Sequence, residues 1–227
     1  MKKILLIIFL FLNVVINSYA QEVSLDAFSK NGNIFLIYDK RNIKQLTYTG
    51  KDYTPTLSPD GQKVAFVRKT KLDDEDYTFD CSTYNEIWLY EIQANSGEAI
   101  VKSQKGEETK EGMKSNLECL GNLQFSPEGK YLYFMSSAWT TSNSIHRYDL
   151  TNKTELFITD GNSLKVIQNG KYKGFLIAEK HKYFDEGGSY DLYWLLTMDG
   201  DEIRDIGESE LSIEQFLRDY NANQKDD

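Results

Sequence analysis

The sequence predicts an all-β protein made of repeated antiparallel sheets, followed by a short C-terminal helix. Its 227 residues include 15 Tyr, 12 Phe and 3 Trp, which favour strands over helices. A turn signature recurs along the chain, and strand-like segments follow it each time. After a predicted signal peptide, roughly 200 residues remain, enough for one all-β domain with a hydrophobic core.

The recurring turn reads Ser-Pro-acidic-Gly, at Ser58–Gly61 and at Ser126–Gly129. Ser favours the first position of a type I turn. Pro fixes φ at the value that the second position requires, and Gly is favoured at the fourth. Phe66 and Phe134 stand at the same distance after the two glycines, inside strand-like runs. The two segments are therefore interpreted as copies of one structural repeat.

Two weaker copies extend the series. One is Gln168–Gly170, with Phe175 at the expected distance, and a degenerate one is Ser29–Gly32. The last two glycine turns lie roughly 40 residues apart, the size of a four-stranded propeller blade. The preceding interval is longer because it holds insertions at 70–86 and 97–116.

These intervals predict a small β-propeller of about four four-stranded antiparallel blades, with the closure of the ring left open. The predicted domains are a signal peptide at 1–20, the propeller at 21–210, and a short helix with a polar tail at 211–227. Ser212 and Gln215 have the spacing of a capping box, which predicts the start of that helix.

The repeats resemble those of TolB-type periplasmic proteins, whose blades carry the same Ser-Pro-Asp-Gly turn. Similar repeats form the propeller domains of prolyl-oligopeptidase-like peptidases. The resemblance covers roughly residues 33–206. It implies a propeller fold and a partner-binding role in the cell envelope, but it specifies no partner and no role in the Tol import system.

The N-terminus predicts export. Lys2 and Lys3 precede the apolar run Ile4–Leu12, and small residues stand at Ser18 and Ala20. This order is typical of a secretory signal peptide, cleaved here near Ala20, with an uncleaved anchor as the alternative. The apolar run is short for a membrane span, and no other long apolar run follows. We therefore expect a periplasmic or secreted protein with no transmembrane segment in the mature chain.

The net charge of the chain limits the classes of molecule that it is expected to bind. The chain has 26 basic and 35 acidic side chains. Without Lys2 and Lys3 the net charge is about −11, which disfavours nucleic acid and anionic lipid. A cell-envelope protein, a small polar ligand or a cation stays compatible, and an incomplete ring would allow self-association.

The two cysteines, Cys81 and Cys119, predict one disulfide. An even cysteine count in an exported protein favours such a bond. Closing a loop of this length would stabilise the fold by roughly 4 kcal/mol in the chain-entropy model. Two separate thiols are the alternative; neither cysteine has a His or Cys at metal-ligand spacing.

The segment Gly187–Asp191 resembles part of a serine-hydrolase elbow, but its chemistry does not fit. The elbow requires Gly-x-Ser-x-Gly before a helix, whereas Asp191 takes the place of the second glycine and a strand-like run follows. His146 and His181 both precede Ser189, opposite to the order of that family. Ser189 is therefore predicted to lie in a hairpin loop, which the glycine pair suits.

The repeat frame also predicts a binding face. Residues 67–85, 135–143 and 177–190 link the second and third strands of successive blades, so the three loops would emerge on one side. Their rings, histidine and carboxylates would form a rim for a polar ligand, a basic partner or a cation, whereas the simpler alternative is a set of solvated loops. The candidate ligand-binding residues are Asp74, Asp76, Trp139, His181, Tyr183, Asp185 and Glu186.

Two further interpretations stay open. A hydrolase or lyase acting on glycans or peptides would use His181, Asp185 and Glu186 as acid or base. No cofactor is predicted; the acidic run 73–76 lacks the alternating ligands of an EF-hand, which leaves a Ca²⁺ site as a minor alternative. His146 aligns with strand residues of other repeats and is predicted to be packed.

Overall fold

A computed structural model describes residues 25–38, 42–70 and 85–222 of the protein. The predicted signal peptide, Asp74, Asp76 and Cys81 lie outside these residues. Cys119 lies within them, and no cysteine of the described part is free. No described helix is long and apolar enough to cross a membrane.

The described strands form four antiparallel sheets, which we number sheet 1 to sheet 4 along the chain. Each sheet is made of strands that are consecutive in the chain. The first consists of β1 (Leu25–Lys30), β2 (Asn33–Tyr38) and β3 (Asn42–Gln45). The second consists of β4 (Asp52–Leu57), β5 (Lys63–Lys69), β6 (Asn85–Glu91) and β7 (Ser96–Val101). The third consists of β8 (Gly121–Phe125), β9 (Tyr131–Ser136), β10 (Ser144–Asp149) and β11 (Thr154–Asp160). The fourth consists of β12 (Lys165–Val166), β13 (Leu176–Tyr183), β14 (Ser189–Leu196) and β15 (Glu202–Gly207).

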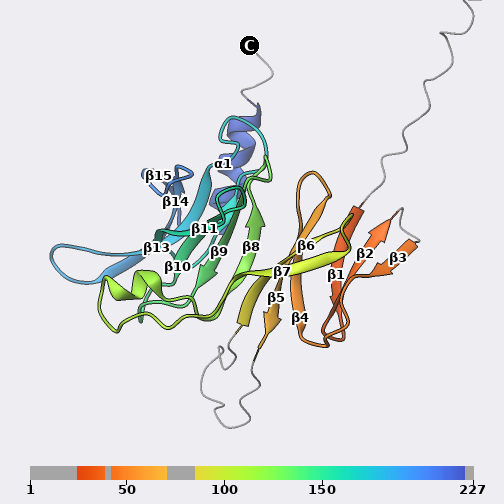
Figure 1. Cartoon of the computed structure of the whole chain (residues 1–227). Coiled ribbons are helices and arrows are strands. Elements are labelled where there is room, and N and C mark those ends of the chain that lie inside the picture. The colour runs from red at the N-terminus through yellow and green to blue at the C-terminus, as the bar shows by residue number, and fades with distance from the viewer. Residues whose placement is uncertain (1–24, 39–41, 71–84, 223–227) are drawn as a thin grey trace, which may run out of the picture.

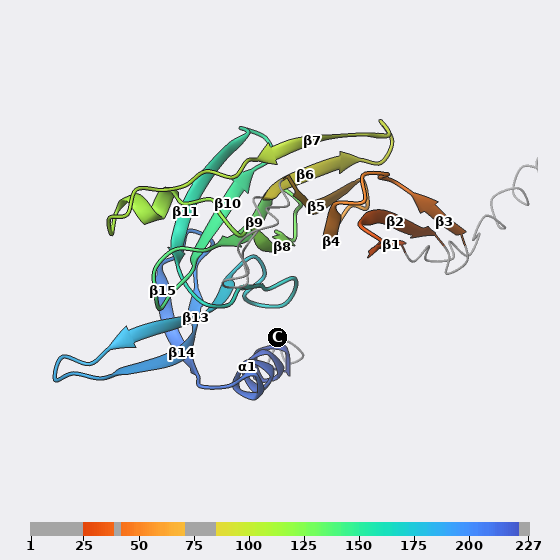
Figure 2. The ribbon, with the colours of Figure 1, turned by 90° about the horizontal axis from the view of Figure 1, so that it is seen from below.

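The sheets follow one another around an arc, as the blades of a propeller do (Figures 1 and 2). Sheet 1 lies at one end of the arc and sheet 4 at the other, and the two do not lie side by side in either view. The predicted small propeller of about four blades is therefore confirmed. Sheet 1 has three described strands where the prediction had four.

The two Ser-Pro turns have the same hydrogen bonds, which confirms the repeat. The Gly61 amide donates to the Ser58 carbonyl at 2.9 Å, and the Gly129 amide donates to the Ser126 carbonyl at 2.8 Å. Each serine hydroxyl also accepts from the first amide of the next strand, from Lys63 at 2.9 Å and from Tyr131 at 3.0 Å. Both serines are buried, so the hydroxyls satisfy backbone groups that water cannot reach.

The turn of the third repeat lies four residues later than predicted, at Gly174 instead of Gly170. Gly61 and Gly129 stand two residues before β5 and β9, and the residue at that place before β13 is Gly174, with φ of +86°, instead of Gly170. An extra turn over residues 171–174 displaces the register. Phe175 consequently precedes the strand and packs beside the outer core of sheet 4.

Hydrophobic cores lie between successive sheets. Ile34 and Leu36 of sheet 1 pack with Val64 and Phe66 of sheet 2. Ile87 and Leu89 pack with Leu132 and Phe134 of sheet 3, and Tyr133 and Ile145 pack with Leu176 and Ala178 of sheet 4. Because strand side chains alternate between faces, each inner sheet contributes to two cores.

The helix α1 (Glu210–Ala222) covers the remaining face of sheet 4. Its Ile213 and Phe216 pack on Ile177 and Leu195, which point away from sheet 3. The helix starts earlier than predicted, because Ser209 is the capping residue instead of Ser212. The Ser212 amide donates to the Ser209 hydroxyl at 3.4 Å, the bond expected of an N-cap.

Candidate binding groove

Two of the three predicted loops meet at the junction of sheets 3 and 4. The loop 137–143 links β9 to β10 as predicted, and the Thr141 hydroxyl lies 3.3 Å from the Tyr183 hydroxyl of β13. The first predicted loop falls largely outside the described residues, so Asp74 and Asp76 have no described position. The structure therefore brings Trp139, His181 and Tyr183 into one place.

The third connection is shorter than predicted. β13 runs to Tyr183 and β14 begins at Ser189, so most of 177–190 is strand and only 184–188 form the turn. His181 and Tyr183 are strand residues two apart, and they lie on one face. Figure 2 shows this hairpin projecting beyond the rest of sheet 4.

A groove of about 520 Å³ lies at this junction, and we call it the Trp139 groove. Its walls come from the segment after β7, the β9–β10 loop, β11 and β13. Its lining residues are Lys110, Lys114, Trp139, Thr141, Ser142, Phe157, Ile158, Thr159, Asp160, His181 and Tyr183.

Trp139 is held in the wall of the groove. Its amide donates to the Ser142 carbonyl at 2.8 Å, and its ring meets Phe157 edge-on at 6.2 Å. The indole N–H is buried and has no hydrogen-bond acceptor among the described residues. An unpaired buried donor costs free energy, and the indole N–H of Trp194 in sheet 4 is a second one among the described residues.

His181 and Tyr183 of β13 also line the groove. Their rings meet edge-on at 4.9 Å, and His181 Nδ1 lies 2.8 Å from Asp191 Oδ1 on the paired strand β14. Tyr183 is 67% exposed, an unusual exposure for a large ring that sits beside a groove. An aromatic face and a hydroxyl are therefore available to a bound molecule at this wall.

The groove is also lined by two lysines that the sequence did not indicate as site residues, Lys110 and Lys114. Lys114 lies in the 3-10 turn η1 (Gly112–Ser115), and its ammonium stands over the Phe157 ring at 5.6 Å. It also donates to Glu111 at 2.7 Å, and this hydrogen bond lowers the pKa of Glu111. Lys110 has no ion-pair partner among the described residues. The segment was interpreted as an insertion, and nothing in its composition links it to Trp139.

The buried Lys180 contacts two residues that line the groove, Thr159 and Asp160. The ammonium of Lys180 donates to Thr159 at 2.8 Å and lies 3.1 Å from Asp160 and 2.9 Å from Glu202. Burial would raise the pKa of Glu202, but hydrogen bonds from Lys182 and Lys180 outweigh it and hold that pKa below its ordinary value. The cluster joins β11 to β13 and β15, and so fixes the two sheets that form the groove.

Asp185 and Glu186 do not line the groove. Both are exposed in the hairpin turn, where Gly187 and Gly188 have positive φ as expected of the glycine pair. His181 pairs with Asp191 and not with either of them. The three acid–base candidates of the hydrolase alternative are thus not joined to one another. Ser189 is the exposed first residue of β14 and forms no hydrogen bond with a described histidine.

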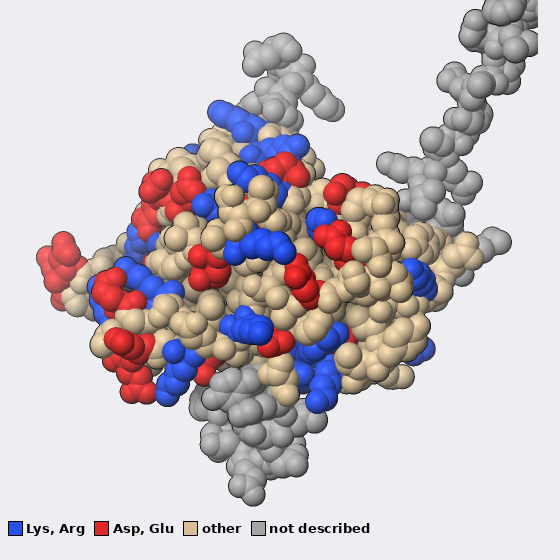
Figure 3. Space-filling view, viewed as in Figure 1, with Lys and Arg blue, Asp and Glu red and all other residues tan. Residues whose placement is uncertain are grey.

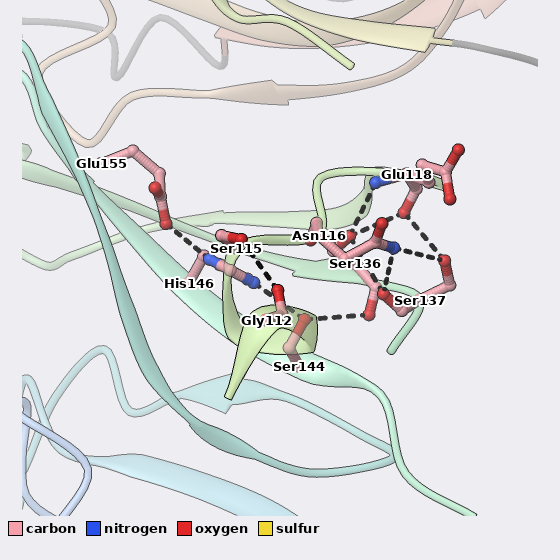
Figure 4. Close-up of polar contacts among 9 residues, drawn as sticks. All are labelled: Gly112, Ser115, Asn116, Glu118, Ser136, Ser137, Ser144, His146 and Glu155. Atoms are coloured by element: carbon pink, nitrogen blue, oxygen red, sulfur yellow. Dashed lines mark hydrogen bonds and ion pairs between the residues drawn. The ribbon is translucent and has the colours of Figure 1, made fainter. Parts of the chain in front are cut away.

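A serine–histidine–glutamate chain exists elsewhere, in sheet 3 (Figure 4). His146 Nε2 lies 2.8 Å from the Ser144 hydroxyl, and its Nδ1 lies 2.5 Å from Glu155. Ser144 and His146 are both fully buried, and the Ser144 hydroxyl donates to the Ser136 carbonyl at 3.3 Å. Because both side chains are sealed inside the sheet, the serine has no access to substrate. As predicted, His146 is a packed residue, stacked on Phe134 at 5.3 Å.

Further polar contacts in Figure 4 hold the segment that carries the groove lysines. The Ser136 hydroxyl lies 2.7 Å from the carbonyl oxygens of both Asn116 and Glu118, within hydrogen-bond distance of each. The Asn116 amide group donates to the Ser137 carbonyl at 2.8 Å.

No group of three or more His, Cys, Asp or Glu side chains in the described ranges is arranged to hold a metal.

Comparisons with known proteins support the fold. No protein-family model and no curated protein matches the chain. A putative TolB from Agrobacterium tumefaciens is 18% identical, with a TM-score of 0.52 over 81% of this chain and 62% of its own. The tricorn protease is 16% identical, with a TM-score of 0.53 over 80% of this chain and 15% of its own. Dipeptidyl peptidase 4 from Porphyromonas gingivalis is 14% identical, with a TM-score of 0.52 over 82% of this chain and 31% of its own.

The chain therefore has the fold of a β-propeller of the TolB type, as its repeats predicted. It spans less than two thirds of the length of the TolB structure that it matches. At these identities the similarity shows the fold alone, since one propeller scaffold carries many functions.

Proposed function

We propose that this protein is an exported, non-enzymatic β-propeller that binds a protein partner or a small polar ligand through the Trp139 groove. The observation that carries the proposal is the convergence of Trp139, His181 and Tyr183 from two sheets onto one groove. Concave sites with aromatic walls and a few placed polar groups are typical of ligand binding. The resemblance to TolB supports a role in the cell envelope.

The lining of the groove favours a ligand with an acidic group. Lys110 and Lys114 line the groove, and Lys110 has no ion-pair partner among the described residues, whereas Lys114 is paired with Glu111. Asp160, the acidic side chain of the lining, is paired with Lys180. Trp139 and Tyr183 offer aromatic faces for the apolar part of the ligand. An acidic segment of an envelope protein or a small organic acid with a ring or sugar moiety meets both requirements. Of the carboxylates expected at the rim, Asp185 and Glu186 lie outside the groove, and Asp74 and Asp76 lie outside the described residues.

Export in this proposal also implies that the two cysteines of the chain are joined by a disulfide. We expect residues 1–20 to be removed as a signal peptide and Cys81 to form a disulfide with Cys119, since the periplasm is oxidising. A non-reduced peptide digest of the exported protein is expected to contain the Cys81 and Cys119 peptides joined. Recovery of both peptides as separate thiols would contradict this part of the proposal.

The binding experiment uses defined probes. Acidic, basic and neutral pentapeptides and small sugar acids are screened by thermal shift against the wild-type protein, and hits are measured by calorimetry. Acidic probes are expected to bind, and Trp139→Ala or the double variant Lys110→Ala/Lys114→Ala is expected to weaken them at least tenfold. Binding that is indifferent to these substitutions, or confined to basic probes, would count against the groove.

The control is Leu211→Ala, which removes an exposed side chain of α1 and is expected to leave binding unchanged. The same samples test the enzyme alternative when the probes are recovered and weighed by mass spectrometry. Intact probes agree with a binding protein. Cleaved or eliminated products that disappear in His181→Ala would favour the hydrolase or lyase.

A further inference from the structure

The outer face of sheet 1 carries an apolar patch that belongs to none of the hydrophobic cores. Ile34 and Leu36 point toward sheet 2, so Phe35 and Ile37 point the other way. Pairing in register places Phe28 beside Phe35 and Ile43 beside Ile37, on the same face. We name Phe28, Phe35, Ile37 and Ile43 the end patch.

The end patch is continuous, with Phe28, Phe35 and Ile37 half-buried and Ile43 exposed. The Phe28 and Phe35 rings are stacked with centroids 5.3 Å apart, and Ile43 is 61% exposed. In Figure 3, the side of the molecule that holds sheet 1 shows few charged side chains, whereas charges of both signs crowd the side of sheet 4. Adjoining apolar side chains that are left partly exposed in this way are typical of interaction surfaces.

The two ends of the arc differ. The outer face of sheet 4 is covered by α1, through Ile213 and Phe216. A second copy therefore finds no bare sheet at that end on which its own end patch could stack. Since sheets of this protein pack face to face, the matching surface for an end patch is the end patch of another copy, which gives a two-fold arrangement.

The charges around the patch fit that symmetry. Asp26 and Lys30 flank Phe28 on β1, on the same face and both exposed. They are roughly 13 Å apart along the strand, too far to pair with each other. A two-fold axis near Phe28 places Asp26 of one copy opposite Lys30 of the other, twice. The pattern acid–ring–base is thus complementary to itself.

From these observations we propose that the end patch is a homodimer interface, in which two copies pack their first sheets face to face around a two-fold axis near Phe28. The interface is independent of the Trp139 groove, which lies between sheets 3 and 4. Each groove consequently stays open in the dimer, and the assembly presents two of them. The dimer would extend the blade-on-blade packing seen within the chain across two molecules.

The first test is sedimentation velocity over a concentration series from 1 to 200 μM, on the order of the range where specific dimers dissociate. The wild-type protein is expected to shift from monomer to dimer. Ile43→Asp is expected to raise the dimer dissociation constant at least tenfold, because it places an acid in the apolar contact. The matched control Leu211→Asp changes a similarly exposed leucine on α1 and is expected to dimerise like wild type.

The second test uses charge reversal. Asp26→Lys and Lys30→Asp each place like charges opposite each other, so each variant alone is expected to stay monomeric. An equimolar mixture of the two is expected to form a heterodimer, because both contacts then join opposite charges. Asp26→Lys/Lys30→Asp in one chain is expected to dimerise again.

The outcomes decide the proposal. A wild-type protein that stays monomeric throughout the series overturns it, whatever else covers the patch. A dimer that survives Ile43→Asp, or a mixture that behaves as two monomers, also overturns it. Circular dichroism of each variant shows that the fold is retained, and the mixture itself reports on variants that fold. Probe binding to the groove is measured separately in each state, so failure of the dimer leaves the proposed function untouched.

Discussion

At the scale of single residues, buried polar side chains hold the repeats together. Ser58 and Ser126 were found by sequence because turn chemistry is local: the serine, its proline and its glycine lie within four positions. Lys180 was not found, although it organises the groove. Its partners Thr159, Asp160 and Glu202 come from other strands, and only the folded chain brings them within reach.

Loss of a turn serine is expected to cost stability. Ser126→Ala removes the acceptor of the Tyr131 amide in a buried site and should lower the free energy of unfolding by about 1–2 kcal/mol. The exposed Ser189→Ala serves as the control and should be neutral. Urea unfolding followed by circular dichroism measures both; equal stabilities for the two variants would contradict the role given to the turn.

Glu202 is expected to make stability depend on acid. Its pKa in the folded protein lies below the ordinary value of 4.5, so its contribution is complete at neutral pH and is lost as pH falls below 4.5 through the folded pKa. Glu202→Gln should lower the free energy of unfolding by about 1–2 kcal/mol at pH 7. The variant should match wild type at a pH low enough to protonate Glu202 of the wild type. Urea unfolding from pH 7 to 3 measures this difference. The exposed Glu186→Gln is the control, and a difference that stays constant across the range would argue against the ion cluster.

At the scale of elements, helix α1 takes the place of a neighbouring blade. The sequence predicted a helix at this end, but not its function as a cover. Its capping residue was misplaced because two serines, Ser209 and Ser212, stand at the same junction. The third repeat was shifted for a similar reason: both Gly170 and Gly174 have positive φ, and sequence alone does not say which of them ends the turn.

Disturbing the cover is expected to expose sheet 4. Phe216→Asp places a charge against Ile177 and Leu195 and should lower the free energy of unfolding by roughly 3 kcal/mol or more. Leu211→Asp changes an exposed residue of the same helix and should be neutral. Hydrogen exchange of β13 and β14 amides should speed up in the first variant alone. Unchanged exchange in Phe216→Asp would show that the helix is not a cover.

At the scale of the whole molecule, neighbouring sheets share their cores. Each core between sheets is built by two of them, so stability passes from one blade to the next. This architecture was predictable because strand periodicity and turns repeat along the chain. The groove was predictable only in part. Trp139 and Tyr183 come from equivalent connections of successive repeats, Trp139 from the β9–β10 loop and Tyr183 from the end of β13. Lys110 and Lys114 come from a segment without a repeat equivalent.

Shared cores are expected to make unfolding cooperative across the arc. Leu132→Ala, in the core between sheets 2 and 3, should cost about 2–5 kcal/mol, while the half-exposed Leu156→Ala in the same sheet should cost far less. Unfolding followed separately by fluorescence of Trp88 in sheet 2 and Trp194 in sheet 4, each kept as the sole tryptophan, should give one midpoint. Two separated midpoints would show that the blades unfold independently.

The Ser144, His146 and Glu155 chain has a consequence for the assignment of function by shape. A template that compares interatomic distances alone would retrieve these three side chains as a hydrolase centre. A covalent serine reagent, which samples the protein from the solvent, would find nothing to acylate there, because Ser144 and His146 are sealed inside the sheet. In proteins built from stacked sheets, reachability of the nucleophile decides what such a coincidence of distances means.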